Sequence, residues 1–387
     1  MIKLIMNGEI YAPDYLGRKD ILITDGRIAA VSDHIPTDGL SQYVEVIDAS
    51  EKYIIPGLID GHVHITGGGG EGSFKTRTPE LQLSDCIKGG ITTVVGVLGT
   101  DGSARTMSNL IAKAKGLTEE GITCFCVSGN YHVPVKTLTG SVETDIMFIQ
   151  EVIGAGEIAI SDHRSSQPSK EEISRLASEA RIGGLLSGKG GAVIVHVGDG
   201  EEKLALIEEI AATTDIPLQQ FITTHINRTY DLLEAGIAFA KNGGFIDFTT
   251  SSIREEHDLS SSRALKKMLE AEVPIEQISF TSDGQGSLPK FNEKGEFVGL
   301  GVGKVTSLFA EVRKAIINEG VPIGTAIKVA TSNPADMLKF SQKGRISEGK
   351  DADMVFLNKA DLTIESVLAK GSFLMKNKSP LVKGTFE

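Results

Sequence analysis

The segment PGLIDGHVHI (56–65) is typical of a buried strand that ends in two histidines. His62 and His64 are two residues apart, so both side chains lie on the same face of an extended strand. If the strand belongs to an α/β barrel, that face is the barrel interior, and functional groups gather at the carboxyl ends of such strands. Two imidazoles that converge there can bind a metal ion. By itself the pattern is weak, since a pair of hydrogen-bonded structural histidines would look the same.

Seven further apolar runs follow, and stretches of helical periodicity separate several of them. The expected helices include residues 168–188, 202–214 and 230–243. Alternating strands and helices indicate a parallel sheet, and eight such units predict a TIM barrel over residues 56–342. A doubly wound open sheet is the alternative, but no glycine-rich dinucleotide-binding loop follows the first strand. The seven runs are TTVVGVL (92–98), TCFCVSG (123–129), EIAIS (157–161), AVIVHVG (192–198), FITTHI (221–226), FIDFTT (245–250) and ISFTSD (278–283).

Both ends of the chain differ from the middle, because they contain short strands and turn signals instead of alternating strands and helices. KLIMNGEIY (3–11) reads as a strand, an Asn-Gly turn and the start of a second strand, and ILITDGRIAAVS (21–32) repeats this design with Asp-Gly. Strand-rich segments return after the barrel, beginning with ADMVFLN (352–358). We therefore expect residues 1–55 and 343–387 to form one small β-sandwich domain, built from both termini, beside the α/β barrel.

Composition limits the classes of function. The chain has 387 residues with 39 basic and 51 acidic side chains, which gives a net charge of −12. Nucleic acids and anionic membranes select basic surfaces, so we expect neither as a partner. Asn7 and Glu9 come too early for a secretory signal peptide, and no apolar run reaches the ~18 residues of a membrane-spanning helix. These observations predict a cytoplasmic protein. Its three cysteines are too few for a disulfide framework.

Three more potential metal ligands lie at the ends of later strands. His196 follows AVIV, His225 follows FITT and Asp283 follows ISFTS. The chain has only eight histidines, and four of them fall at strand ends in the order His-x-His, His, His. Structural histidines are a poor joint explanation of that placement. Imidazole and carboxylate groups are zinc ligands, and a barrel would bring these strand ends together. The pattern therefore predicts a metal centre.

This order of residues resembles the amidohydrolase superfamily, whose members carry P-G-x-I-D-x-H-x-H after a β-rich start and then His, His and Asp. The segment KGRISEGKDADMVFL (343–357) resembles the return from barrel to sandwich in that superfamily. Within it, the chain resembles the isoaspartyl (β-aspartyl) dipeptidases over its whole length. The matching motifs are HVHITGGGGEG (62–72) with TRTPE (76–80), VVGVLGTDG (94–102), SGNYHVP (128–134) with TGSVE (139–143), ISDHRSS (160–166), and THINR (224–228) with SDGQGS (282–287).

The resemblance implies a binuclear metal-dependent amidohydrolase with two divalent ions, for which this type of ligand set favours zinc. Relatives often bridge the two ions with a carboxylated lysine just before the I-S-D-H-R motif. Here Glu157 stands at that place, and no lysine lies between Lys136 and Lys170. Because a glutamate is itself an anionic, bidentate ligand, we expect Glu157 to bridge the ions without CO₂. The alternative is a salt-bridged barrel residue and a single ion. The other expected ligands are His62, His64, His196, His225 and Asp283.

The resemblance also implies roles for residues around the metals. Asp283 would pass a proton from the attacking hydroxide to the leaving amine, and Tyr131 would donate its phenol to the developing oxyanion. Glu71 would pair with the α-ammonium group of the substrate, or else be a solvated loop carboxylate. His163 would support its loop rather than bind metal. Two arginines would bind substrate carboxylates, and two hydroxyl residues are weaker candidates for substrate contacts; these four are Arg164, Arg228, Thr100 and Ser287.

The implied reaction is hydrolysis of the isopeptide bond between an aspartyl β-carboxyl group and the amine of the next residue, with a metal-bridging hydroxide as nucleophile. A cyclic-amide hydrolase of the dihydroorotase type is the first alternative, although one acidic and two basic specificity residues suit a charged dipeptide better. A non-catalytic scaffold of the same fold is the second, although such proteins lose ligands that are all present here. Relatives form homo-oligomers, so we expect one here, while the preferred residue after the β-aspartyl group stays open.

Overall fold

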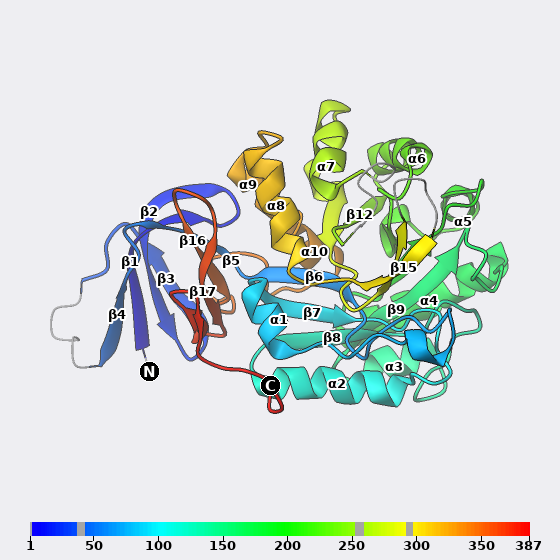
Figure 1. Cartoon of the computed structure of the whole chain (residues 1–387), viewed down its shortest axis with the longest axis horizontal. Coiled ribbons are helices and arrows are strands. Elements are labelled where there is room, and N and C mark those ends of the chain that lie inside the picture. Colours follow the sequence, from blue (N-terminus) through cyan, green and yellow to red (C-terminus); the bar gives the residue numbers. More distant parts are fainter. Residues whose placement is uncertain (1, 37–42, 252–258, 292–296) are drawn as a thin grey trace.

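Two sheets dominate the computed structural model, which describes residues 2–36, 43–251, 259–291 and 297–387. An eight-stranded parallel sheet curls into a barrel ringed by helices, and a nine-stranded sheet made from the two ends of the chain lies beside it (Figure 1). The blue N-terminal strands and the red C-terminal strands are found on the same side of the barrel. The expected α/β barrel with a β domain built from both termini is confirmed.

Each of the eight expected barrel strands is present, and neighbours in the chain pair in parallel. The fourth strand begins earlier than expected, since Val152 already pairs with Cys126 and Gly154 with Ala192. The strands are β6 (Leu58–Val63), β7 (Ile91–Gly96), β8 (Thr123–Ser128), β9 (Val152–Ile160), β10 (Ala192–Val197), β11 (Phe221–Thr224), β12 (Phe245–Thr249) and β13 (Ile278–Thr281).

The barrel closes between its first and last strands through a few specific contacts. Val63 and Gly284 form a parallel bridge, and the Ser282 amide donates a hydrogen bond of 3.0 Å to Oδ1 of the buried Asp60. The His64 amide donates to the carbonyl of Gly284 at 2.9 Å. Closure therefore sets the histidine-bearing end of β6 against the end of β13.

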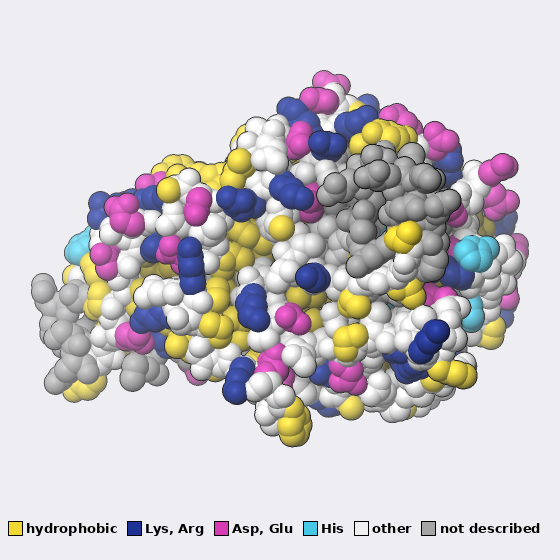
Figure 2. Space-filling model, in the orientation of Figure 1, with side chains coloured by type: hydrophobic (Ala, Val, Ile, Leu, Met, Phe, Trp, Pro, Cys, Tyr) yellow, Lys and Arg dark blue, Asp and Glu magenta, His cyan; other side chains and the backbone are white. Residues whose placement is uncertain are grey.

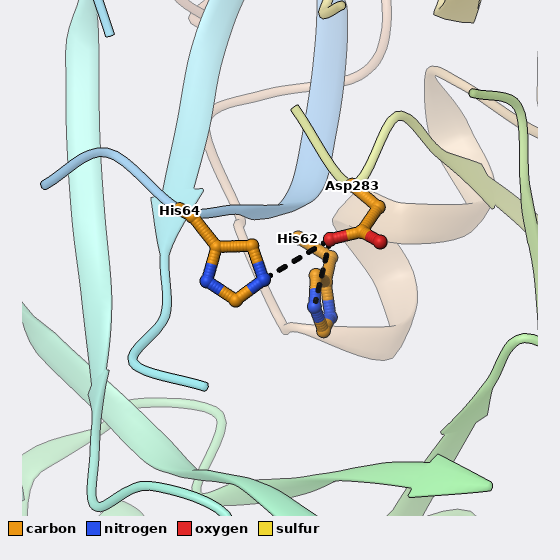
Figure 3. A group of neighbouring side chains, drawn as sticks. All are labelled: His62, His64 and Asp283. Atoms are coloured by element: carbon orange, nitrogen blue, oxygen red, sulfur yellow. Dashed lines mark ion pairs between the residues drawn. The ribbon is translucent and has the colours of Figure 1, made fainter. Parts of the chain in front are cut away.

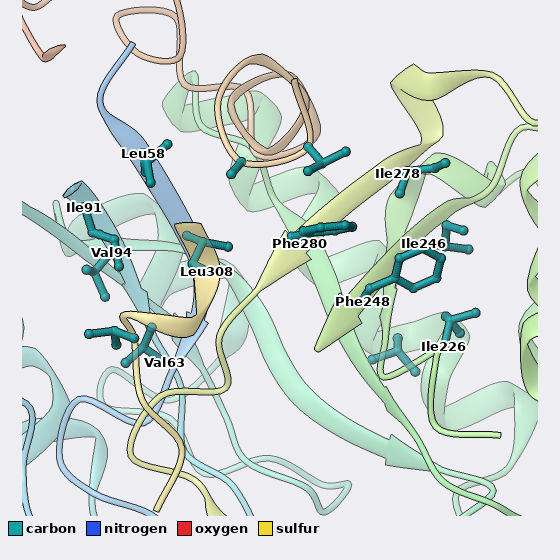
Figure 4. Packing of buried hydrophobic residues seen from close by; sticks show 14 of the residues in the cluster. Leu58, Val63, Ile91, Val94, Ile226, Ile246, Phe248, Ile278, Phe280 and Leu308 are labelled. Atoms are coloured by element: carbon teal, nitrogen blue, oxygen red, sulfur yellow. The ribbon is translucent and has the colours of Figure 1, made fainter. Parts of the chain in front are cut away.

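Helices cover the outside of the barrel and pack apolar side chains against the strands (Figures 1 and 4). Leu308 from a late helix joins Phe248 and Phe280 of the last two strands in this layer, where the two rings lie 5.9 Å apart. The three expected helices are α4, α5 and α6. The helices are α1 (Leu83–Lys88), α2 (Met107–Glu120), α3 (Val142–Phe148), α4 (Lys170–Ser187), α5 (Ala205–Thr213), α6 (Tyr230–Lys241), α7 (Ser261–Glu270), α8 (Ser307–Ile317), α9 (Ile323–Lys328) and α10 (Ser332–Met337).

The side chains that point into the barrel alternate with those of the outer layer. On β10, Val193 and Val195 belong to the cluster packed on the helices, whereas Ile194 belongs to a separate inner cluster. His196 continues the inward series at the carboxyl end of the strand, as period-two alternation predicts. Leu338, just after α10, belongs to the same inner cluster, and its backbone lies against Gly190, two residues before β10. Apolar side chains thus fill one end of the barrel, and polar side chains occupy the other.

The terminal sheet has its own apolar core and runs in the order β19-β18-β17-β16-β5-β1-β2-β3, with β4 also paired to β1. The two ends of the chain meet where β5 and β16 pair antiparallel. The division into domains at residues 55 and 343 stays a prediction. The strands are β1 (Ile2–Tyr11), β2 (Tyr15–Thr24), β3 (Arg27–Ser32), β4 (Val44–Asp48), β5 (Lys52–Pro56), β16 (Met354–Asn358), β17 (Ile364–Ala369), β18 (Ser372–Lys376) and β19 (Ser379–Pro380).

One of the two expected N-terminal turns is wrong. Asp25 and Gly26 have φ angles of 49° and 72° and connect β2 to β3 as a two-residue hairpin, as predicted. Asn7-Gly8 instead lies inside β1, where the register with β2 shifts and Asn7 has a φ of 65°. Its amide donates to Oδ1 of the buried Asp20 at 2.9 Å, and a Cβ on Gly8 would come within 2.5 Å of an isoleucine on β5. Packing on both sides turns this dipeptide into a bulge rather than a hairpin.

One hairpin outside the two main sheets was not predicted. After the last barrel strand, β14 (Ser287–Phe291) and β15 (Phe297–Val302) form an antiparallel hairpin.

Basic and acidic side chains are interspersed on the face shown in Figure 2. All three cysteines are buried and free. Among the helices of the described residues, none combines the length and the apolar character that a membrane crossing requires.

A buried ion pair joins the barrel to the terminal sheet and can be tested by mutation. Lys343 is 5% exposed, and its Nζ lies 2.6 Å from Asp353, 2.9 Å from Asp351 and 2.7 Å from Thr123 Oγ1 on β8. Removing the cation leaves the buried Asp353 without a cationic partner and Asp351 with only Arg27 at 3.9 Å, so we expect Lys343→Met to lower the free energy of unfolding by ~3–5 kcal/mol in chemical denaturation. Lys241→Met, at the exposed end of α6, should change it by less than ~0.5 kcal/mol. Equal stabilities of the two variants would contradict this prediction.

Candidate metal centre

Polar side chains converge at the carboxyl end of the barrel, where the strand ends predicted them. The buried carboxylate of Glu157, on β9, lies among four imidazoles. His62 Nε2 and His64 Nε2 are 3.2 Å and 3.9 Å from its Oε2. His196 Nδ1 and His225 Nε2 are 2.8 Å and 3.3 Å from its Oε1. Each oxygen of this carboxylate therefore faces its own pair of histidines.

Asp283 completes the cluster from the end of β13. Its Oδ1 lies 3.1 Å from His64 Nε2 and 3.9 Å from His62 Nε2, and the three side chains point toward one another (Figure 3). These three residues offer ligand atoms within 4.8 Å of one another, and so do His62, Glu157 and His225. The structure thus brings five of the six expected metal-binding residues together in two adjacent groups that share His62. The sixth, His196, lies outside both groups but contacts Glu157 Oε1 at 2.8 Å.

Several buried atoms of the cluster have no hydrogen-bond partner within the described part of the chain. They are both ring nitrogens of His62, Nδ1 of His64, Oε2 of Glu157 and Oδ1 of Asp283. An unpaired buried polar atom costs ~1–3 kcal/mol, so such atoms gathered in one place call for a bound group. Imidazole nitrogens and carboxylate oxygens are the donors that zinc takes. The cluster therefore fits divalent cations.

Two of these side chains reach the cluster because the backbone turns sharply out of the strand. His225 and Asp283 have φ angles of 69° and 51°, in the left-handed region that non-glycine residues occupy at a cost of ~1–3 kcal/mol. A hydrogen bond of 2.5 Å between Nδ1 and Thr249 Oγ1 holds the ring of His225 in place. The backbone of Gly286 packs closely on the other side chain, since a Cβ there would come within 2.7 Å of Asp283 Oδ1. Strain is thus concentrated where the candidate ligands lie.

Burial and neighbouring charges set the protonation of the cluster. Burial alone would raise the pKa of Glu157, but the surrounding imidazoles hold it well below its usual range. Burial acts in the same direction on Asp283, yet the neighbouring histidines lower its pKa to about 2. Burial would lower the pKa of His62, but the two carboxylates raise it to about 9. Burial lowers the pKa of His225 to about 3. Both acids are therefore ionised at neutral pH, as ligands of a cation must be.

Tyr131, which follows β8, lies beside the cluster. Its hydroxyl is 2.9 Å from His196 Nδ1, and the guanidinium of Arg164 lies over its ring at 5.4 Å from the centroid. The side chain is buried, and burial raises the pKa of the phenol well above its usual value. The phenol therefore keeps its proton and is available as a hydrogen-bond donor.

A cavity of about 410 Å³ opens above the cluster, and charged groups line its walls. Glu71 reaches it from the glycine-rich loop after β6. Its Oε1 accepts a hydrogen bond of 2.9 Å from Thr100 Oγ1 and lies 3.4 Å from Arg164 Nη1. Arg228, after β11, and Ser287, at the start of β14, line the same cavity. The structure therefore brings all five expected substrate-binding residues to one space.

Sequence reasoning missed Asp162, which follows β9 and is 5% exposed. Its Oδ2 lies 2.9 Å from His196 Nε2, accepts a hydrogen bond of 2.7 Å from Arg164 Nη2 and is 3.7 Å from Arg228 Nη1. A signal was available, since this acid ends a barrel strand at the same edge as the other candidates. His163 also lines the cavity, but its side chain is 86% exposed and lies outside the ligand cluster.

Known proteins resemble the chain over nearly its whole length. The model of the Amidohydrolase family matches residues 53–385. A crystal structure of the β-aspartyl dipeptidase from Fervidobacterium islandicum AW-1, in complex with β-Asp-Leu dipeptide, is 46% identical with a TM-score of 0.92, over 98% of this chain and 97% of that one. A second structure of that enzyme is 43% identical with a TM-score of 0.90, over 98% of both chains.

Curated relatives match over a smaller share of their own length. An allantoinase from Desulfitobacterium hafniense is 39% identical over 66 residues, which cover 17% of this chain and 14% of the relative. An adenine deaminase from Oenococcus oeni is 23% identical over 377 residues, which cover 95% of this chain and 58% of the relative. Because so much of these relatives has no counterpart here, their activities do not carry over. The match over residues 53–385, with histidines and acids at the strand ends, shows that the chain belongs to the amidohydrolase family.

Proposed function

We propose that this protein hydrolyses the isopeptide bond of β-aspartyl dipeptides. The observation that carries the proposal is the charge of the cavity above the ligand cluster, whose walls present the carboxylate of Glu71 and the guanidinium groups of Arg164 and Arg228. A β-aspartyl dipeptide carries one ammonium group and two carboxylates, which complement those charges. The 46% identity with a dipeptidase that binds β-Asp-Leu, over 98% of this chain, supports the same substrate class.

The substrate would take the place of contacts that the protein now makes with itself. Glu71 and Arg164 face each other at 3.4 Å, and Thr100 holds the carboxylate in position. The ammonium group of an aspartyl residue would pair with Glu71, and the two carboxylates would pair with the arginines. The Ser287 hydroxyl would add a further contact from the opposite hairpin. These charged contacts explain why a cyclic amide such as dihydroorotate, which carries one carboxylate and no ammonium group, would suit the cavity less well.

The cluster below would supply the chemistry. A bound divalent cation acts as a Lewis acid, which lowers the pKa of water and polarises an amide carbonyl. Asp283, ionised and at the edge of the cavity, would accept a proton from the attacking water and deliver it to the leaving amine. The protonated phenol of Tyr131 would donate a hydrogen bond to the oxyanion that develops on the carbonyl. The residues that would hold two such cations, with zinc favoured by the donor set, are His62, His64, Glu157, His196, His225 and Asp283.

Glu157 would bridge the two cations in place of a carboxylated lysine. Its Oε2 faces His62 and His64, whereas its Oε1 faces His196 and His225. This division suits a bridging anion, because Glu157 would have donor atoms available to two ions. No lysine is found among the described residues that line the cavity.

The homo-oligomer and the cytoplasmic location inferred from the sequence are part of the same proposal.

A substrate panel tests the function. With zinc present, we expect kcat/KM for β-Asp-Leu to exceed the values for α-Asp-Leu and for dihydroorotate by on the order of 10²-fold or more. α-Asp-Leu carries the same charges but places them differently around the scissile bond, and dihydroorotate lacks the ammonium group and one carboxylate. Glu71→Gln and Arg228→Met each remove a charge-assisted contact, and should each cost ~1.5–3 kcal/mol in transition-state binding of β-Asp-Leu. Arg175→Met, on the exposed face of α4, is the matched control. Faster hydrolysis of dihydroorotate would refute the proposal.

The role of Asp283 as proton shuttle predicts a selective loss of turnover. Asp283→Asn has the same shape but no useful proton affinity, so we expect kcat to fall by ~10²–10⁴-fold. Metal content, measured by mass spectrometry of the purified variant, should stay close to that of wild type. A variant that keeps more than about a tenth of wild-type kcat would show that another group moves the proton.

The bridging role of Glu157 predicts independence from CO₂. Metal-free wild type should recover full activity when zinc is added in CO₂-free buffer, because a glutamate bridge is covalently permanent. Glu157→Ala should bind fewer than two metals per chain, since two cations ~3.5–4 Å apart repel strongly without an anion between them. Glu157→Lys should be active only when bicarbonate is added, because the lysine must take up CO₂ to become an anion. The assignment fails if wild-type reactivation needs bicarbonate, or if the alanine variant still binds two metals.

A further inference from the structure

Asp162 connects the ligand cluster to the arginines of the cavity wall. Its buried carboxylate presents Oδ2 to His196 Nε2 at 2.9 Å, to Arg164 Nη2 at 2.7 Å and to Arg228 Nη1 at 3.7 Å. Its Oδ1 accepts hydrogen bonds from the backbone amide and from Nε of Arg164, at 2.8 Å and 3.0 Å. One carboxylate therefore meets a candidate metal ligand and both arginines.

His196 lies between two carboxylates, and only one of them can receive its ring proton. Nδ1 is 2.8 Å from Glu157 Oε1, and Nε2 is 2.9 Å from Asp162 Oδ2. A neutral imidazole carries one proton, so one nitrogen donates while the other presents a lone pair. Ligation of a cation beside Glu157 needs the lone pair on Nδ1, which puts the proton on Nε2, facing Asp162. A carboxylate on the far nitrogen orients histidine ligands in this way and raises their basicity.

The same carboxylate also sets the position of Arg164. Two nitrogens of the guanidinium, Nε and Nη2, bind Asp162 side-on, in the two-point geometry that matches a planar guanidinium to a carboxylate. The third, Nη1, points toward Glu71 at 3.4 Å across the cavity. Without Asp162 the long side chain would regain its rotamer freedom. The contact thus leaves one nitrogen of Arg164 directed at the place where substrate would bind.

We infer that Asp162 is a positioning residue for both metal binding and substrate recognition. It holds His196 with Nδ1 toward the metal site, and it holds Arg164 toward the cavity. The part that concerns Arg164 rests on the proposed function, whereas the part that concerns His196 requires no substrate. Loss of Asp162 therefore changes two quantities that are measured separately, the affinity for zinc and the KM for the dipeptide.

Asp162→Asn tests both parts, because it keeps the size of the side chain and removes its charge. We expect Zn²⁺ binding to weaken by on the order of 10–100-fold, measured without substrate by competition with a fluorescent chelator. At saturating Zn²⁺, KM for β-Asp-Leu should rise by about tenfold or more. The matched control is Asp199→Asn, which removes the same charge from an exposed position on the cavity wall and should leave the zinc affinity within about twofold of wild type.

Zinc affinity of Asp162→Asn within about twofold of wild type would overturn the inference. An equal loss in Asp199→Asn would overturn it too, because net charge alone would then explain the effect. If Asp162→Asn does not fold, NMR of the zinc-loaded wild type with ¹⁵N-labelled histidine decides the matter. A proton on Nε2 of His196 supports the inference, and a proton on Nδ1 overturns it. Weakened zinc binding without any dipeptide hydrolysis by wild type would support the role of Asp162 toward His196 and refute only the proposed function.

Discussion

The site depends on one buried anion, the carboxylate of Glu157. A charge this far from water is stable only when groups of opposite charge and hydrogen-bond donors surround it. Its partners are imidazoles from β6, β10 and β11, so they meet only if the barrel has curled into its closed shape. The contacts that close the barrel between β6 and β13 also bring Asp283 to the same place. Closing the fold and assembling the ligand cluster are therefore one event.

Charges alternate outward from this anion. Imidazoles surround Glu157, the carboxylates of Asp162 and Asp283 lie beyond them, and the arginines with Glu71 line the cavity outside. Each carboxylate meets an imidazole or a guanidinium, which lowers the cost of burying so many ionisable side chains together. The outermost groups are only partly buried, so a charged ligand can take up their remaining contacts. Recognition in such a cavity depends on matching charges rather than on apolar shape.

Much of this arrangement could be predicted from residue order. The ends of parallel strands share one edge of a barrel, so His196, His225 and Asp283 could be grouped although they are far apart in the chain. The position of Asp162 at a strand end could have placed it in the same group, but its contact with the far nitrogen of His196, 34 residues away, is described by no local pattern. The Asn7-Gly8 turn was wrong for a similar reason, since neighbouring strands decide whether that dipeptide bends the chain or forms a bulge.

Residue order is enough to predict the eight strands, the barrel they form, the sheet made from both termini and the strand-end histidines with Asp283, because short-range periodicity and the meeting of strand ends are local rules. Glu157 came from the resemblance. The arrangement of side chains in space shows in addition that the two oxygens of Glu157 face different pairs of histidines, and that His196 presents one nitrogen to Glu157 and the other to Asp162. Such pairings depend on distances of a few ångströms between side chains on separate strands, and those distances are set by how the whole barrel packs.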